Sequence, residues 1–148
     1  MPTFRSLTRE EEQEIDRYLI FAMELVPIVP EAQEEGFLIV ATHIMIEALR
    51  EGQQAPSGVS LDDVVLWLGI LWGEELCRVA NWNWGYLSLE NDFEALAVVD
   101  QNKGRACFPM HLIANWIQNK EQTNDCMTLF AGLFKGKPLA ENGFVVLG

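Results

Sequence analysis

The chain has few of the side chains on which metal and nucleophilic chemistry usually depend. It contains two histidines, His43 and His111, and three cysteines with no Cys-x-x-Cys spacing. An odd cysteine count without that spacing indicates neither a disulfide framework nor a zinc site. His43 and Glu47 stand four residues apart, as do Cys107 and His111, but neither pair has the third group that a metal site or an activated nucleophile requires. We therefore expect no metal, no cofactor and no catalytic residue.

Basic side chains are also scarce, since ten Lys and Arg are outnumbered by 22 Asp and Glu and the formal net charge is −12. Nucleic acid and anionic membrane surfaces both require a basic footprint, so neither is expected as a partner. The acids are concentrated in residues 1–100, which hold 19 acids and five bases, whereas residues 101–148 hold three and five. The negative electrostatic field of these acids favours a basic protein partner, attracted by electrostatic steering. The alternative is that the charge only aids solubility.

No apolar run approaches the roughly 20 residues that a bilayer-spanning helix needs. The N-terminal segment Met1–Arg5 leads into acidic residues instead of an apolar stretch, so no signal peptide is expected. A cytoplasmic location follows as the simplest expectation. At 148 residues with 49% apolar side chains, the chain is long enough and apolar enough for one domain over residues 1–148.

The chain is organised around a central helix that begins after Ser60. Ser60 is a good N-cap, and Asp62 and Asp63 suit the positive end of the helix dipole. Every residue from Val64 to Trp72 is apolar or glycine. A helix that is apolar on all sides is buried, so this segment is predicted to lie in the core.

Gly69 and Gly73 lie on one face of this helix, and each costs about 1 kcal/mol of helix propensity relative to alanine. Two interpretations account for them: close packing against the sheet or another helix, or a ligand groove. In the second, Glu74 would be an acid or base beside the groove. Otherwise Glu74 and Glu75 mark where the helix emerges into solvent, with Glu75 near Arg78 at i,i+3.

Helices are expected on both sides of this segment. The sequence from Thr8 to Glu11 is a capping box that begins a first helix. A second helix is expected from about Glu31 to Arg50, and its predicted buried stripe is Phe37, Val40, Ala41, Ile44, Met45 and Ala48. A helix started by Pro109 and another capped by Thr123 or Asn124 complete a set of about five.

Strands are expected between Trp82 and Phe108. Trp82, Trp84 and Tyr86 alternate, as do the residues from Phe93 to Val99, and Arg105–Phe108 forms a short third strand. The predicted class is therefore α+β, a three-stranded antiparallel meander packed by about five helices. The apolar tail Phe144–Leu147 adds a fourth strand or packs on the core.

The Leu68-Gly69-x-x-x-Gly73-Glu74 helix, followed by Trp82 and Trp84 on a strand and then by Phe108-Pro109, resembles a bacterial family of unknown function. The resemblance spans about half the chain, from Leu61 to Phe134. It implies an α+β fold and carries over no catalytic residue. Small acidic α+β proteins of similar type occur beside bacterial toxins as immunity proteins.

The surface acids are the main candidates for function. We expect a non-enzymatic, acidic binding protein, an immunity protein that neutralises a basic toxin by stoichiometric occlusion. Its predicted partner-binding residues are Glu31, Glu34, Glu35, Glu90, Asp92, Glu94 and Asp100. The alternative is a small-ligand-binding protein or enzyme that uses the Gly69/Gly73–Glu74 region.

Overall fold

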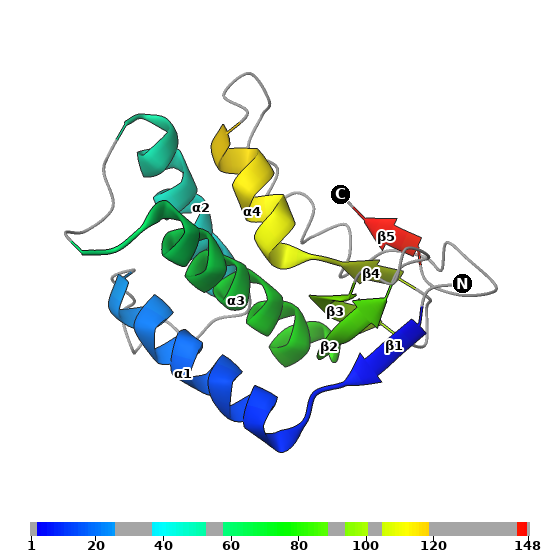
Figure 1. Ribbon diagram of the computed structural model, residues 1–148. Helices are drawn as coiled ribbons and strands as arrows, with labels where there is room; N and C mark the ends of the chain where they lie inside the picture. Colours follow the sequence, from blue (N-terminus) through cyan, green and yellow to red (C-terminus); the bar gives the residue numbers. More distant parts are fainter. Residues whose placement is uncertain are drawn as a thin grey trace.

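A computed structural model of the chain describes residues 3–25, 37–52, 58–88, 94–100, 105–118 and 145–147 (Figure 1). These residues form four helices and five strands, which confirms the expected α+β class. In chain order they are β1 (Thr3–Ser6), α1 (Arg9–Leu25), α2 (Phe37–Arg50), α3 (Leu61–Ala80), β2 (Asn83–Ser88), β3 (Glu94–Asp100), β4 (Arg105–Cys107), α4 (Pro109–Gln118) and β5 (Val145–Leu147). The helix expected after Thr123 or Asn124 lies outside the described residues.

The strands form one sheet in the order β1-β2-β3-β4-β5. The predicted antiparallel meander is confirmed as β2, β3 and β4. Two edge strands extend it. β1 pairs antiparallel with β2, so that Arg5 lies opposite Tyr86, and β5 pairs parallel with β4. The sequence pattern missed β1 because Thr3–Ser6 has one apolar residue and no alternation, and its pairing depends on β2, about 80 residues later in the chain.

Helix α3 lies at the centre of the molecule, where it contacts α1, α2 and α4 and reaches β2 and β3 (Figure 1). The predicted cap is confirmed, since the Ser60 hydroxyl accepts a hydrogen bond of 3.1 Å from the backbone N–H of Asp63. At its other end Asn81 adopts a left-handed conformation with φ 59°, which asparagine tolerates better than most residues. Nine of its 20 residues are buried, including the unbroken run from Leu68 to Gly73, so the middle of the helix lies in the core as its composition predicts.

The sheet has apolar side chains on both faces. Val98 and Cys107 join the main core, in which Trp72 of α3 meets Trp116 of α4 edge-on at a centroid distance of 6.0 Å. The neighbours of Val98 on the strand point to the opposite face, as strand geometry requires. There Ala97 and Val99 form a second buried cluster with Leu87 and Ala106.

The face that helix α2 turns to the core overlaps only in part with the one predicted. Leu38, Ile39, Thr42 and Ile46 are buried, whereas Val40 and Ile44 of the predicted stripe are exposed. The prediction is wrong for Val40 and Ile44, whereas Ala41 and Met45 of the same stripe pack against the core. Because α2 is apolar on nearly every side, periodicity does not select one face. Packing against α3 and α4 decides the orientation instead. Thr42 is accommodated inside because its hydroxyl donates to the Leu38 carbonyl at 2.7 Å.

Candidate functional site

The two glycines of α3 allow close packing. A Cβ atom on Gly69 would lie 3.0 Å from both the Cγ and the backbone nitrogen of Met110, at the start of α4. A Cβ atom on Gly73 would lie 2.4 Å from Cη2 of Trp84 and 3.1 Å from Cγ of Pro109. Neighbouring residues therefore pack against the glycine face, as the packing interpretation predicts.

Glu74 belongs to the same packed region. Its Oε2 accepts a hydrogen bond of 3.0 Å from the indole nitrogen of Trp84, and both side chains are partly buried. The carboxylate therefore fixes the orientation of the indole that covers Gly73. This contact explains why an acid follows the second glycine without requiring a role in acid–base chemistry.

Glu75 is fully buried, contrary to the expectation that both acids mark the exit of the helix into solvent. Its Oε2 accepts a hydrogen bond of 2.8 Å from the backbone N–H of Leu38, in the first turn of α2. Its other oxygen pairs with Arg78, as the i,i+3 spacing predicts. A carboxylate suits this place because the first N–H groups of a helix have no partner within the helix and carry partial positive charge.

Two of the seven predicted partner-binding acids lie within the described residues. They are Glu94 and Asp100, at opposite ends of β3. Given the rise of a strand, their backbones are roughly 20 Å apart. Glu31, Glu34, Glu35, Glu90 and Asp92 lie outside the described residues. Glu94 and Asp100 therefore do not form a single cluster.

Asp100 pairs with an arginine of its own chain. Its carboxylate lies 3.2 Å from Nη2 of Arg105, whose side chain is only 2% exposed. The Arg105 guanidinium also lies over the ring of Trp82, 5.3 Å from its centroid. Asp100 and Trp82 together compensate a buried cation, which a charge in such a place requires. The geometry thus gives Asp100 a structural contact.

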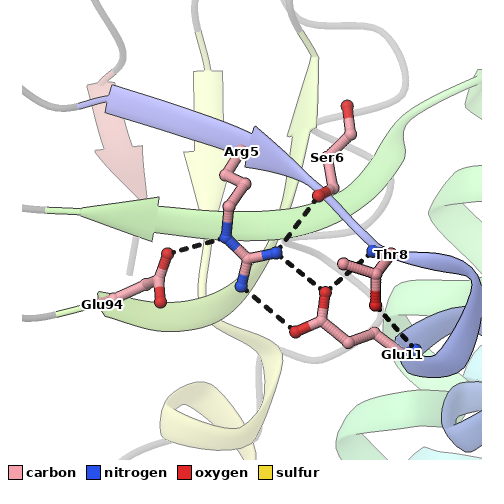
Figure 2. Close-up of polar contacts among 5 residues, drawn as sticks. All are labelled: Arg5, Ser6, Thr8, Glu11 and Glu94. Carbon is pink, nitrogen blue, oxygen red and sulfur yellow. Dashed lines mark hydrogen bonds and ion pairs between the residues drawn. The ribbon is translucent and has the colours of Figure 1, made fainter.

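Glu94 belongs to a second arginine cluster, centred on Arg5 of β1 (Figure 2). The Arg5 guanidinium donates to Glu11 at 2.8 and 3.1 Å and to Glu94 at 3.1 Å, and it lies 4.6 Å from the ring centroid of Tyr86. Arg5 therefore joins the edge strand β1 both to α1 and to β3. We call Arg5, Glu11 and Glu94 the Arg5 clasp.

The predicted capping box at the start of α1 is confirmed and shares Glu11 with this clasp. The Thr8 hydroxyl accepts from the Glu11 N–H at 3.2 Å, and the Glu11 carboxylate accepts from the Thr8 N–H at 2.8 Å (Figure 2). Hydrogen bonding to Arg5, and then to Thr8, lowers the pKa of Glu11 to about 2. The same bonds to Glu11 and Glu94 raise the pKa of Arg5 above its ordinary value.

Two tyrosines next to the clasp also have perturbed acidity. A hydrogen bond from the Tyr18 hydroxyl to the Glu14 carboxylate raises the pKa of Tyr18. Burial raises the pKa of Tyr86, and the negative charges of Glu11 and Glu14 add to the effect. Both phenols therefore stay protonated near neutral pH, and the Tyr18 hydroxyl donates its hydrogen bond to Glu14.

The largest described set of exposed acids lies on α1, which sequence reasoning did not assign to binding. Its exposed members are Glu10, Glu12, Glu14, Asp16 and Glu24. Arg9 and Arg17 are the basic residues of the same helix. The feature of the sequence that could have identified this surface is the excess of acids over bases along the whole helix.

Candidate chemical groups elsewhere are held in packing positions. Burial raises the pKa of the Cys77 and Cys107 thiols well above the ordinary range, which disfavours the reactive thiolate. Within the part of the chain that the structure describes, no three His, Cys, Asp or Glu side chains lie together as a metal site would need. None of the four described helices is long and apolar enough to cross a membrane.

Comparisons with known proteins identify a similar fold. No protein-family model matches the chain, and a search of curated proteins finds no match. Among solved structures, the chain is similar to a protein from Bacteroides thetaiotaomicron VPI-5482, with a TM-score of 0.62 and 16% sequence identity. The similarity covers 90% of this chain and 47% of the other, so the chain spans about half the length of that protein. At this identity the match shows the fold alone.

Proposed function

We propose that this chain is an acidic, stoichiometric protein-binding module of the immunity-protein type, which neutralises a basic toxin by occluding it. The observation that carries the proposal is the exposed acidic surface of α1, which combines five exposed acids with a net charge of −12 for the chain. A negatively charged surface raises the rate of encounter with a basic protein. It repels nucleic acid and other acidic partners.

The proposed interface combines α1 with the acids that the sequence predicts as partner-binding residues. Glu31, Glu34, Glu35, Glu90 and Asp92 remain in the proposal as partner-binding residues. Glu94 and Asp100 also remain, but each already contacts an arginine of this chain. A partner would have to compete with Arg5 for Glu94 and with Arg105 for Asp100. For this reason we assign most of the steering charge to the exposed acids of α1.

The first experiment is capture from a lysate of the source cell, with the tagged protein as bait at low salt. The expected result is one basic protein retained at a 1:1 ratio and released as the salt concentration rises, because screening weakens attraction between exposed charges. Expression of that protein alone should then arrest growth, and co-expression of this chain should restore it.

Charge-reversed variants test the surface itself. Asp16→Lys with Glu24→Lys changes two exposed acids outside the first turn of α1, so the capping box is left intact. Association with the captured protein should slow about tenfold at low salt. The matched control, Arg17→Gln, removes an exposed cation from the same helix and should leave the rate unchanged or raise it. The same reversal at Glu90 and Asp92 tests the acids predicted from the sequence.

The proposal is wrong if charge reversal at Asp16, Glu24, Glu90 and Asp92 leaves the association rate and its salt dependence as they are in the unmodified protein. It is also wrong if the captured protein binds but has no toxic activity that this chain suppresses. Thermal unfolding of each variant controls for loss of structure.

A further inference from the structure

The C-terminal half of α1 presents apolar side chains to solvent. Ile20, Phe21 and Met23 are 59%, 42% and 41% exposed, and they are three of the six large apolar side chains that are exposed in the described part of the chain. Ile20 and Met23 are three residues apart, so they lie next to each other on the helix surface. The Phe21 ring lies beside Trp67 of α3, at a centroid distance of 5.7 Å. Three exposed apolar side chains so close together on one helix favour an interaction site.

Exposed acids lie on both sides of Ile20. Asp16 is one turn before it and Glu24 is one turn after it, so both adjoin it on the helix surface. Neither carboxylate takes part in the ion pairs of the described residues. Arg17 is the only base within four residues of Ile20. The surroundings of the apolar patch therefore carry a net negative charge.

The start of α3 extends this acidic surface. Because α1 begins beside the sheet and α3 ends beside it, the two helices run antiparallel, and the first turn of α3 lies at the same end of the pair as Glu24 (Figure 1). That turn contains Leu61, Asp62 and Asp63, and all three are exposed. Residues 18–25 and 58–65 together contain no lysine or arginine. We call this end of the helix pair, residues 20–24 of α1 and 61–63 of α3, the α1–α3 tip.

Glu24 indicates the charge of the group that this tip suits. The C-terminal end of a helix carries partial negative charge, which favours a base and disfavours an acid. Glu24 lies in the last turn of α1, and that turn contains no base. Asp62 and Asp63 lie instead at a helix start, where acids are favourable. In the free protein Glu24 therefore opposes the dipole of its own helix, and a cation from a partner would relieve that cost.

We infer that the α1–α3 tip binds a basic segment of the partner protein in which apolar side chains are flanked by lysines or arginines. The apolar side chains pack on Ile20 and Met23, and the cations pair with Asp16 and Glu24. A second copy of this chain fits less well, because two molecules of charge −12 repel each other and their tips would bring acids together. An anionic membrane is disfavoured for the same reason. The inference rests on the proposed function, to which it adds the apolar anchor of the acidic α1 surface.

Two fluorescent model peptides test the inference. One is a short helical peptide with a row of leucines flanked by lysines, and the second has serine in place of each leucine. Fluorescence anisotropy measures binding of both peptides to the intact protein at low salt. The protein should bind the Lys–Leu peptide about tenfold more tightly than the Lys–Ser peptide, because only the leucines can pack on an apolar anchor.

The decisive variant combines Ile20→Ser with Met23→Ser. It should lose about tenfold in affinity for the Lys–Leu peptide and keep its affinity for the Lys–Ser peptide. The matched control combines Val40→Ser with Ile44→Ser, which removes two aliphatic side chains of similar exposure, 43% and 62%, from α2. The control should leave both affinities within about twofold. Because all four side chains are exposed, both variants should remain folded, which circular dichroism checks.

A second variant, Glu24→Gln, tests the charge of the tip. It should weaken binding of both peptides about threefold, since both contain lysines, and it should raise the midpoint of thermal unfolding because it relieves the unfavourable charge at the end of α1. A residue with a purely structural role would not combine higher stability with weaker binding. The matched control is Glu51→Gln, which removes an exposed acid from the C-terminal end of α2 and should leave both affinities unchanged.

Three results would overturn the inference. The first is unchanged affinity of the Ile20/Met23 variant for the Lys–Leu peptide, or an equal loss in the Val40/Ile44 control. If charge reversal at Asp16 and Glu24 still slows association with the captured protein, this result leaves the proposed function standing. The second is a dimer in sedimentation equilibrium that the Ile20/Met23 variant dissociates, since a second copy would then cover the tip. The third is no binding of either peptide at low salt.

Discussion

The guanidinium of Arg5 donates to both carboxylate oxygens of Glu11, at 2.8 and 3.1 Å. The two residues are six positions apart in the sequence, yet they belong to different elements, because β1 ends at Ser6 and α1 begins at Arg9. One carboxylate thus caps the first helix and binds the cation of the edge strand (Figure 2). Glu11 therefore couples the start of α1 to the attachment of β1 on the sheet.

The first prediction concerns that coupling. Glu11→Gln removes the charge that binds Arg5 and weakens the capping box, so it should lower the midpoint of thermal unfolding by several degrees. Glu12→Gln is the matched control, because Glu12 is the next acid of the same helix turn and is exposed. Its midpoint should change little. Equal midpoints for the two variants would show that the clasp does not stabilise the fold.

The second prediction is the pH dependence of the same contact. In the folded protein, hydrogen bonding to Arg5 and Thr8 lowers the pKa of Glu11 to about 2, from an ordinary value of 4.5. A depressed pKa means that the unfolded chain binds the proton first as the pH falls, so the stabilisation is full above about pH 5 and decreases toward pH 2. The difference in unfolding free energy between the unmodified protein and Glu11→Gln should follow this curve in urea titrations. A difference that stays constant from pH 7 to about pH 3 would contradict the folded-state pKa.

The third prediction concerns Gly73. Alanine would gain about 1 kcal/mol of helix propensity. Its Cβ would, however, lie 2.4 Å from the Trp84 ring, closer than any real contact. Overpacking of this kind costs roughly 1–3 kcal/mol, and the hydrogen bond from Trp84 to Glu74 restrains the ring from moving away. Gly73→Ala should therefore destabilise the protein in urea denaturation.

A double-mutant cycle separates this contact from any general effect on the helix. Trp84→Val removes the ring atoms nearest to Gly73, so the cost of Gly73→Ala should shrink or change sign in that background. An equal cost in both backgrounds would place the clash elsewhere.

Local features of this fold could be predicted from sequence, and features that depend on distant residues could not. The Thr8–Glu11 capping box, the Ser60 cap and the Glu75–Arg78 pair all lie within one helical turn, where spacing alone decides contact. The outward face of α2 could not be read because nearly all its residues are apolar, and its orientation is set by α3 and α4.

The candidate site shows the same division. An acidic composition indicates that the surface charge is negative. Whether a given acid is free to meet a partner depends on which other side chains the fold brings next to it. The sequence predicts Asp100 as one of the partner-binding acids because it flanks the meander together with Glu90, Asp92 and Glu94. Five residues later the chain supplies Arg105, which turns inward and requires a counter-charge. No periodic pattern marks an arginine as buried, so Asp100 could not be distinguished from a surface acid.

The fourth prediction concerns Glu75 and has an unusually close control within the chain. Glu75→Ala leaves the Leu38 N–H without its acceptor inside the protein, at a cost of roughly 1–3 kcal/mol. Glu47 and Arg50 on α2 are also a Glu–Arg pair at i,i+3, but the Glu47 carboxylate is exposed. Glu47→Ala should therefore change the unfolding free energy by less than about 0.5 kcal/mol. Similar losses from both substitutions in urea denaturation would mean that burial of Glu75 adds nothing.

The fifth prediction concerns Asp100 and Arg105. Asp100→Ala leaves a guanidinium that is 2% exposed without its counter-charge, and breaking such a buried pair costs roughly 3–5 kcal/mol. Replacing both residues, with Asp100→Ala and Arg105→Met, removes the stranded cation and should recover much of that loss. Urea denaturation of the single and double variants measures the recovery. If the double variant is no more stable than Asp100→Ala, Asp100 does not compensate the buried charge of Arg105. Its carboxylate then becomes a stronger candidate for contact with the partner protein.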